Sequence, residues 1–187
     1  MTLRILGGQY KGRILKSPKS KTTRPTQGVL RQAVFNICQQ KIEQARFLDL
    51  FAGSGAMGLE ALSRGASHAV FVEQDRGAAL CIRENISLLH VEDKALLISV
   101  DLFLALTKLG KQKCSFDLIY IDPPYGNPDF LRTVLEEAEK QKLLAQEGTI
   151  FIEDSSLDPE INYESKFLKK VDVRRFGIAR LYQFKHL

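Results

Sequence analysis

The sequence lacks the features that mark membrane and secreted proteins. Its longest apolar runs, such as Leu118 to Ile121, fall far short of the roughly 20 residues that cross a bilayer. The first residues, Met1 to Gly8, contain no apolar stretch of the kind found in a secretory signal. At 187 residues the chain is also too short for an eight-fold α/β barrel. We expect a cytoplasmic protein without a membrane span.

Cysteine is scarce. The three residues Cys38, Cys81 and Cys114 are odd in number and widely spaced, without a C-x-x-C pair or a nearby pair of histidines. This spacing argues against a disulfide framework and against a zinc site. We therefore expect three buried thiols and no metal.

Acidic residues are almost missing from the start of the chain. Residues 1–46 contain ten Lys and Arg against the single acid Glu43, which gives +9, whereas residues 47–187 carry −4. A basic segment on a mildly acidic body favours a polyanionic partner, and a soluble basic tail without a partner is the alternative. The same change of composition divides the chain into a basic extension, 1–46, and a main domain, 47–187.

The extension has a hairpin pattern followed by a helical one. Short extended runs at 3–6 and 13–15 flank a turn-rich stretch, 7–12, and together they predict a hairpin that presents Tyr10, Lys11 and Arg13. Apolar residues recur at helical spacing after Pro25 and Thr26, which predicts a helix there.

From residue 47 onward, apolar runs alternate with helical patterns, which predicts an α/β fold with a parallel sheet and helices on both faces. A final pair of runs, joined at Gly177, predicts an antiparallel hairpin at one sheet edge. Ligands bind such sheets beyond the carboxyl ends of the strands. The predicted strands are 47–51, 69–72, 95–100, 116–121, 149–152, 168–176 and 178–184, and the predicted helices are 55–64, 76–89, 102–109 and 130–144.

The first strand leads into a glycine-rich turn, 48–58. Glycines allow a sharp turn and bring the backbone close to a ligand, beside a helix N-terminus. The spelling G-x-G-x-x-G suits a dinucleotide as well as other nucleosides, so the turn alone does not choose the cofactor. The residues that we expect around a cofactor here are Asp49, Phe51, Gly53, Ser54, Gly55 and Gly58.

Carboxylates follow the next two strands. Glu73 is placed to accept hydrogen bonds from both hydroxyls of a ribose. Asp101 stands where an adenine amino group could lie, although capping of the helix that follows explains it equally well.

The fourth strand ends in Asp122-Pro123-Pro124-Tyr125. Two prolines stiffen the chain behind a carboxylate and ahead of an aromatic ring. Asp122 and the Pro123 carbonyl can accept hydrogen bonds from an exocyclic amino group, and Tyr125 offers a face on which an extruded base can stack. This cluster favours methylation of a base amino group, with residues 122–125 as the catalytic set.

These motifs resemble those of S-adenosylmethionine-dependent amino-methyltransferases, and the wider pattern resembles the RsmD family, which methylates guanine N2 in bacterial 16S ribosomal RNA. The wider pattern comprises residues 4–13, Arg24-Pro25-Thr26 with Arg31, Phe35 and Asn36, then 59–66 and 180–182. The resemblance implies a Rossmann-like class I methyltransferase with a seven-stranded, mostly parallel sheet. It also implies S-adenosylmethionine over the glycine-rich turn, Glu73 on its ribose and the target base against 122–125.

The expected partner is small-subunit ribosomal RNA, alone or assembled with ribosomal proteins, and the expected state is a monomer. We expect the RNA to contact Tyr10, Lys11, Arg13, Arg24, Thr26 and Arg31. The alternatives are an amino-methyltransferase for another base, such as adenine N6 in DNA, an NAD(P)-dependent oxidoreductase, and an RNA-binding module without activity.

Overall fold

The computed structural model describes residues 2–18, 28–123, 127–155, 157, 159–161 and 163–187, and the backbone of 25–27. Seven strands form one sheet in the order β3-β2-β1-β4-β5-β7-β6. The strands β1 (Arg46–Asp49), β2 (His68–Val72), β3 (Ala95–Ile98), β4 (Phe116–Ile121) and β5 (Leu144–Ser155) are parallel, and β6 (Leu168–Phe176) and β7 (Ala179–His186) add an antiparallel pair. The predicted sheet and its edge hairpin are confirmed.

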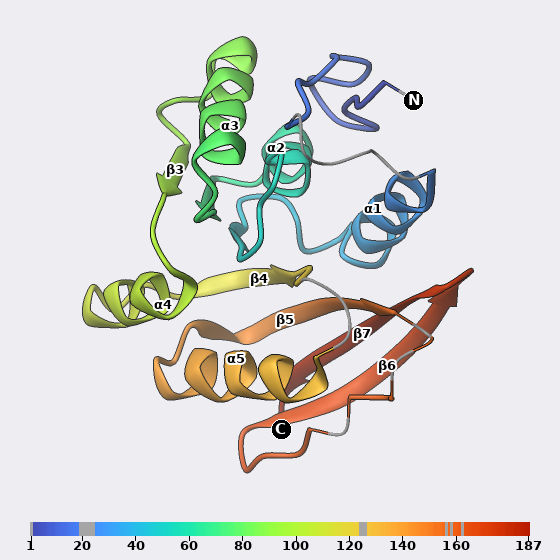
Figure 1. Ribbon diagram of the computed structural model, residues 1–187, viewed down its shortest axis with the longest axis vertical. Helices are drawn as coiled ribbons and strands as arrows, with labels where there is room; N and C mark the ends of the chain where they lie inside the picture. The colour runs from blue at the N-terminus through green and yellow to red at the C-terminus, as the bar shows by residue number, and fades with distance from the viewer. Residues whose placement is uncertain (1, 19–24, 124–126, 156, 158, 162) are drawn as a thin grey trace.

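Helices cover both faces of the sheet (Figure 1). The helices α1 (Pro25–Ile37), α2 (Ala56–Ser63) and α3 (Arg76–Leu89) pack on one face, and α4 (Leu102–Lys111) and α5 (Pro128–Lys140) pack on the other. β1, β2, β4 and the second half of β5 are buried on both sides, which explains why their sequences are continuous apolar runs rather than alternating ones. The run in β3 is partly exposed, because β3 is an edge strand.

The largest error in the predicted elements lies between α5 and β5. The helix predicted over 130–144 ends at Lys140, because Lys142 adopts a left-handed conformation with φ of 55°. The apolar pair Leu143 and Leu144 continues the helical spacing, but both side chains are buried in the cluster beneath the sheet. The strand predicted over 149–152 therefore begins earlier, at Leu144.

The N-terminal pairing is a minimal hairpin. A single antiparallel bridge joins Arg4 to Ile14, with backbone bonds from Ile5 N to Arg13 O (3.0 Å) and from Leu15 N to Leu3 O (2.9 Å). The side chains of Ile5 and Leu15 are buried in the cluster that also contains residues of α1, α2 and α3. This segment, called here the N-terminal loop (residues 3–16), thus lies directly on the main body of the protein.

Two features of the described residues bear on the classes considered above. No helix among them is long and apolar enough to cross a membrane, and no group of three or more His, Cys, Asp or Glu is arranged to hold a metal ion. Cys38 and Cys81 are buried as free thiols, but Cys114 is only partly buried, because it lies in the turn after α4. The expectation of three buried thiols is wrong for Cys114.

Candidate active site

The glycine-rich turn between β1 and α2 lies against the end of β2. Gly53 and Gly55 have φ of 55° and 78°, in the left-handed region that favours glycine, and Gly55 caps α2. The Gly53 N–H donates to Glu73 Oε2 (2.8 Å), and Glu73 Oε1 accepts from Asp75 N (2.9 Å). The turn and the carboxylate predicted to share a ligand are therefore in direct contact.

Asp49 lies beneath the same turn. Its side chain is buried, and Oδ2 accepts from Gly58 N at 3.4 Å. A Cβ at Gly58 would lie 2.3 Å from Cε1 of Phe71, so Gly58 permits the close approach of α2 to β2. Gly58 therefore has a packing role in addition to the expected place beside a cofactor.

The direction of these hydrogen bonds bears on the ligand. In a dinucleotide site the turn amides face a pyrophosphate, whereas here the amides of Gly53 and Gly58 donate to the carboxylates of Glu73 and Asp49. A negatively charged ligand group would be repelled by both carboxylates. The turn therefore suits a ligand whose charge here is neutral or positive.

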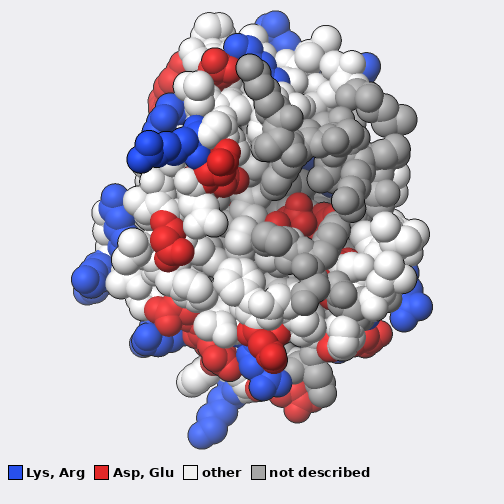
Figure 2. Space-filling view, in the orientation of Figure 1, with Lys and Arg blue, Asp and Glu red and all other residues white. Residues whose placement is uncertain are grey.

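More carboxylates gather at the ends of β4 and β5. The buried hydroxyl of Tyr120 donates to Glu153 Oε2 (2.5 Å), and burial, Glu153 and then Asp122 raise its pKa well above the usual value. Asp122 is partly buried and Pro123 is buried, while Pro124 and Tyr125 lie outside the described residues. Figure 2 shows acidic side chains in the middle of this face, between α1 and the carboxyl end of β4.

Glu153 was not among the predicted site residues. The signal was present, because Glu153 and Asp154 follow the apolar run 149–152 just as Asp122 follows its own strand. The acidic strand ends thus come from three neighbouring strands: Asp49 from β1, Asp122 from β4 and Glu153 from β5.

Asp101 occupies the position for which two explanations were open. Its Oδ1 accepts from Phe103 N (2.9 Å) and Leu104 N (3.3 Å), so it caps α4. On the same side of the sheet, the ring of Phe51 packs edge-on against Phe130, which in turn contacts Phe103. Phe51 therefore helps to fix α4 and α5 beside the turn.

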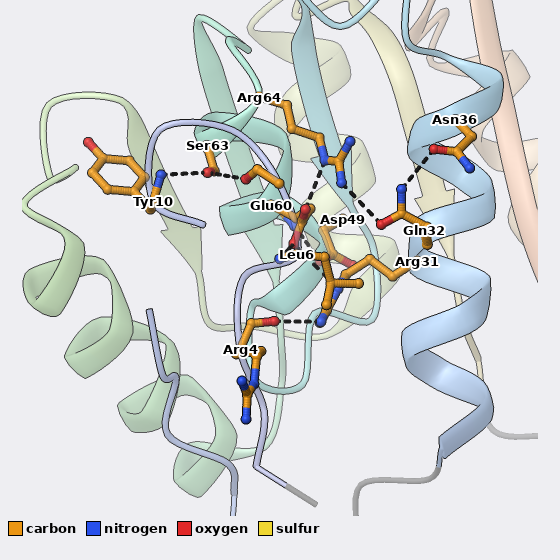
Figure 3. Close-up of polar contacts among 12 residues, drawn as sticks. Arg4, Leu6, Tyr10, Arg31, Gln32, Asn36, Asp49, Glu60, Ser63 and Arg64 are labelled. Atoms are coloured by element: carbon orange, nitrogen blue, oxygen red, sulfur yellow. Dashed lines mark hydrogen bonds and ion pairs between the residues drawn. The ribbon is translucent and has the colours of Figure 1, made fainter. Parts of the chain in front are cut away.

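Arg31, one of the residues expected to contact RNA, is almost wholly buried. Its side chain is only 5% exposed; Nη2 donates to the Arg4 carbonyl (2.7 Å), and Nε lies 3.6 Å from Glu60 Oε2 (Figure 3). Burial lowers the Arg31 pKa, and the charge of Glu60 opposes this shift. A buried guanidinium needs such a partner, so Arg31 is a structural residue of α1.

Glu60 joins the N-terminal loop to α1 and α2 (Figure 3). The carboxylate is fully buried and accepts from Leu6 N (2.7 Å) and from Arg64 Nε (2.8 Å), in addition to pairing with Arg31. Ser63 adds to this junction, because its Oγ accepts from Tyr10 N (2.9 Å) and donates to the Gly7 carbonyl.

The other predicted RNA contacts divide into exposed and undescribed residues. Lys11 and Arg13 are exposed on the N-terminal loop, and Tyr10 is partly buried. Arg24 and the side chain of Thr26 lie outside the described residues.

Asn85, on α3, is a further site residue that the sequence prediction missed. Its buried amide donates to the Ser54 carbonyl in the glycine-rich turn (2.9 Å) and to the Lys16 carbonyl (3.0 Å), and its oxygen accepts from Lys16 N (2.8 Å). Asn85 therefore connects the N-terminal loop to the turn. No local pattern marks it, because it reads as an ordinary polar helix residue.

The chain matches the family model described as "Conserved hypothetical protein 95" over residues 3–185. It is 37% identical over 155 residues to "Ribosomal RNA small subunit methyltransferase D" of Escherichia coli K12, covering 81% of this chain and 74% of that protein. The chain belongs to the RsmD family. The E. coli structure titled "Putative methyltransferase yhhF" has a TM-score of 0.86 at 29% identity and covers 100% of this chain and 98% of its own.

The fold of this RsmD-family member extends to more distant methyltransferases. A structure titled "A putative sam-dependent methyltransferase from Streptococcus mutans" has a TM-score of 0.73 at 14% identity, over 88% of this chain and 50% of that one. At that identity the likeness concerns the fold alone. The sheet is therefore that of a class I methyltransferase, with the glycine-rich turn and Asp122 at its carboxyl edge.

Proposed function

We propose that the chain transfers a methyl group from S-adenosylmethionine to the N2 amino group of a guanine in small-subunit ribosomal RNA. Its family makes it an S-adenosylmethionine-dependent ribosomal RNA methyltransferase. The observation that carries the proposal is the meeting of the glycine-rich turn with acidic strand ends at one sheet edge. The oxidoreductase alternative has no support, because carboxylates accept from the turn amides that a pyrophosphate would need.

The acidic turn fits the methyl donor. S-adenosylmethionine carries a sulfonium and an amino group against one carboxylate, so negative side chains around it are favourable. We assign its ribose to Glu73, its amino-acid part to the region of Asp49 and the backbone at Gly53–Gly55, and its adenine to the side near Asp101. When bound, the donor supplies an activated methyl group, and the chain must align it with the attacking nitrogen.

Asp122 and the Pro123 carbonyl are assigned to the target amino group. Both are acceptors only, so they can hold the two N–H groups of an exocyclic amine and direct its lone pair toward the methyl group. As the nitrogen becomes positive during transfer, the Asp122 charge stabilises it in a partly buried setting. The amine then loses its proton readily, so Asp122 need not remove it beforehand.

A first experiment tests donor binding. Glu73→Ala removes one to two charged hydrogen bonds to the ribose, so donor affinity should fall, each bond being worth roughly 1.5–3 kcal/mol. Calorimetric titration with S-adenosylmethionine measures this, and Glu73→Gln, which keeps an acceptor, is the matched control. Unchanged affinity in folded Glu73→Ala would remove the donor from this site.

A second experiment tests the chemistry. Asp122→Ala should lower kcat about a hundredfold or more, as when one electrostatic stabiliser is lost, with donor affinity nearly unchanged. The measurement is methyl transfer to small-subunit ribosomal RNA from a strain that lacks the enzyme, with mapping of the modified nucleotide. Activity within a few-fold of wild type would contradict the role of Asp122, and methylation of another base would contradict the guanine assignment.

A further inference from the structure

The antiparallel hairpin brings a second basic segment to the catalytic edge of the sheet. Residues 168–187 contain six Lys and Arg against one acid, Asp172. Because β7 runs against β5, the turn between β6 and β7 lies at the same edge as the carboxyl ends of the parallel strands. We call residues 174–178, which lead into and form this turn, the hairpin tip.

The strand register places the hairpin tip beside and beyond Asp122. Ile121 pairs with Ile152, which pairs with Tyr182, while the ladder continues three residues further to Ser155 and Ala179. At about 3.3 Å per residue and 4.8 Å between strands, Ala179 stands roughly 10 Å beyond the end of β4 and roughly 10 Å to its side. Arg174 and Arg175 lie on β6, one strand farther out, where they pair with Leu181 and Arg180. An RNA strand whose target base lies at Asp122 would therefore reach the tip within a few nucleotides of that base.

The base of the tip is held firmly. Arg180 is buried, and its Nη2 donates to Asp154 Oδ2 (3.0 Å) and to the carbonyls of Ser155 (2.6 Å) and Pro159 (3.2 Å). Its guanidinium also lies 5.6 Å from the centre of the Tyr182 ring. The turn therefore projects from a fixed support and can present its side chains in a defined position.

Three side chains of the tip face solvent, whereas Phe176 is partly buried against the core. The Arg174 and Arg175 side chains are 51% and 68% exposed, and Ile178 is 57% exposed after Gly177, whose φ is 61°. Arg174 pairs with Asp172 (2.8 Å) and Arg175 with Glu160 (3.8 Å), but exposed pairs of this kind are weak and can yield to a phosphate. Figure 2 shows basic side chains at the rim of this face, over β6.

We propose that the hairpin tip contacts the RNA strand next to the target nucleotide, with Arg174 and Arg175 on phosphates and Ile178 against a neighbouring base or ribose. The inference rests on the proposed function and adds a second contact, separate from the N-terminal loop. Arginine binds phosphates in bidentate fashion, and an exposed apolar side chain beside it suits the face of an unstacked base.

The test compares Arg174→Gln/Arg175→Gln with a control that loses the same charge elsewhere. Lys108 and Lys111 are exposed at the carboxyl end of α4, close to the start of β4 and therefore at the amino ends of the parallel strands. Lys108→Gln/Lys111→Gln is therefore the matched control. The probe is small-subunit ribosomal RNA from a strain lacking the enzyme, and RNA affinity is measured at several salt concentrations.

If the tip holds two phosphates, the tip variant should reduce the slope of log affinity against log salt by roughly 1.5 and raise the RNA KM about tenfold. The control should keep the wild-type slope, and donor affinity should be unchanged in both variants. Arg174→Lys/Arg175→Lys should restore the wild-type salt slope. Ile178→Ser should raise the RNA KM and leave the salt slope unchanged.

Equal slopes in the tip variant and the control would overturn the inference, and the charges on β6 would then serve only to protect an exposed sheet edge. The proposed function would survive that result, provided that the wild-type protein methylates the RNA. Failure of the wild-type protein itself to methylate the RNA would overturn the proposed function instead.

Discussion

Gly28 and Gly58 both lie in helices, but their surroundings differ. Gly58 in α2 has the Phe71 ring where its Cβ would be, at 2.3 Å, whereas no described atom lies within 4 Å of a Cβ at Gly28 in α1. Helix propensity favours alanine equally at the two positions. Packing therefore decides the effect of each substitution.

Gly28→Ala should stabilise the protein by up to about 1 kcal/mol, because it removes backbone freedom from the unfolded chain. Gly58→Ala should instead destabilise it by about 1–3 kcal/mol through overpacking against Phe71. Urea unfolding followed by circular dichroism measures both. The double variant Gly58→Ala/Phe71→Leu should recover part of the loss, and strictly additive effects would argue against this contact.

At the scale of single residues, the sequence indicated which residues lie at the edge of the sheet better than it indicated which side chains pair with each other. Glu73 and Asp122 were predicted because each follows an apolar run, and Asp49 because it begins the glycine-rich turn; the sheet brings these positions to one edge. The ion pair of Arg31 with the buried Glu60 was not predicted, because Glu60 belongs to another helix and no local pattern indicates the pair.

Among the elements, α3 has a function beyond covering the sheet. The side chain of Asn85, on its inner face, forms hydrogen bonds with both the glycine-rich turn and the N-terminal loop. The position of the turn therefore depends on a loop that is about 40 residues earlier in the sequence, through one amide side chain.

Asn85→Ala should lower stability by about 1–3 kcal/mol, because the Ser54 carbonyl and both backbone groups of Lys16 lose their hydrogen bonds to the buried Asn85 amide. It should also speed hydrogen exchange of the Lys16 amide and weaken donor binding. Asn36→Ala removes an exposed asparagine and should change stability by less than about 0.5 kcal/mol. Unchanged protection of the Lys16 amide in Asn85→Ala would contradict the bridging role.

Most helices and strands were predictable because apolar runs and helical spacing alternate clearly from residue 47 onward. The exception at 141–148 has a physical cause: Leu143 and Leu144 extend the apolar spacing of α5, but the backbone turns at Lys142 and directs them under the sheet. The long strand β5 includes polar residues such as Gln146 and Glu147, which carry no strand signal of their own.

Across the whole molecule, the basic N-terminal segment is both a charged surface and part of the core. Ile5 and Leu15 are buried with residues of three helices, while Lys11 and Arg13 stay exposed. Composition revealed the charge of residues 1–46, but it could not reveal how much of the segment is buried against α2 and α3.

Deletion of residues 1–16 should therefore destabilise the whole protein, since loss of each large buried side chain costs about 2–5 kcal/mol. Lys11→Gln/Arg13→Gln in the full chain should leave stability unchanged and lower only RNA affinity. Urea midpoints and RNA binding at several salt concentrations separate packing from charge. A truncated protein that unfolds at the wild-type urea concentration would show that the loop is dispensable for the fold.

The order of strands also matters for how the protein is made. β5 pairs with β7, which is synthesised after it and after β6, so a growing chain carries β5 with one edge unpaired. Residues 149–152 of that strand are buried in the finished sheet, and an apolar strand with an open edge is a site of aggregation. β7, which carries Arg180 and Tyr182, therefore also covers the open edge of β5. A chain terminated before β7 should aggregate rather than fold into an enzyme of reduced activity.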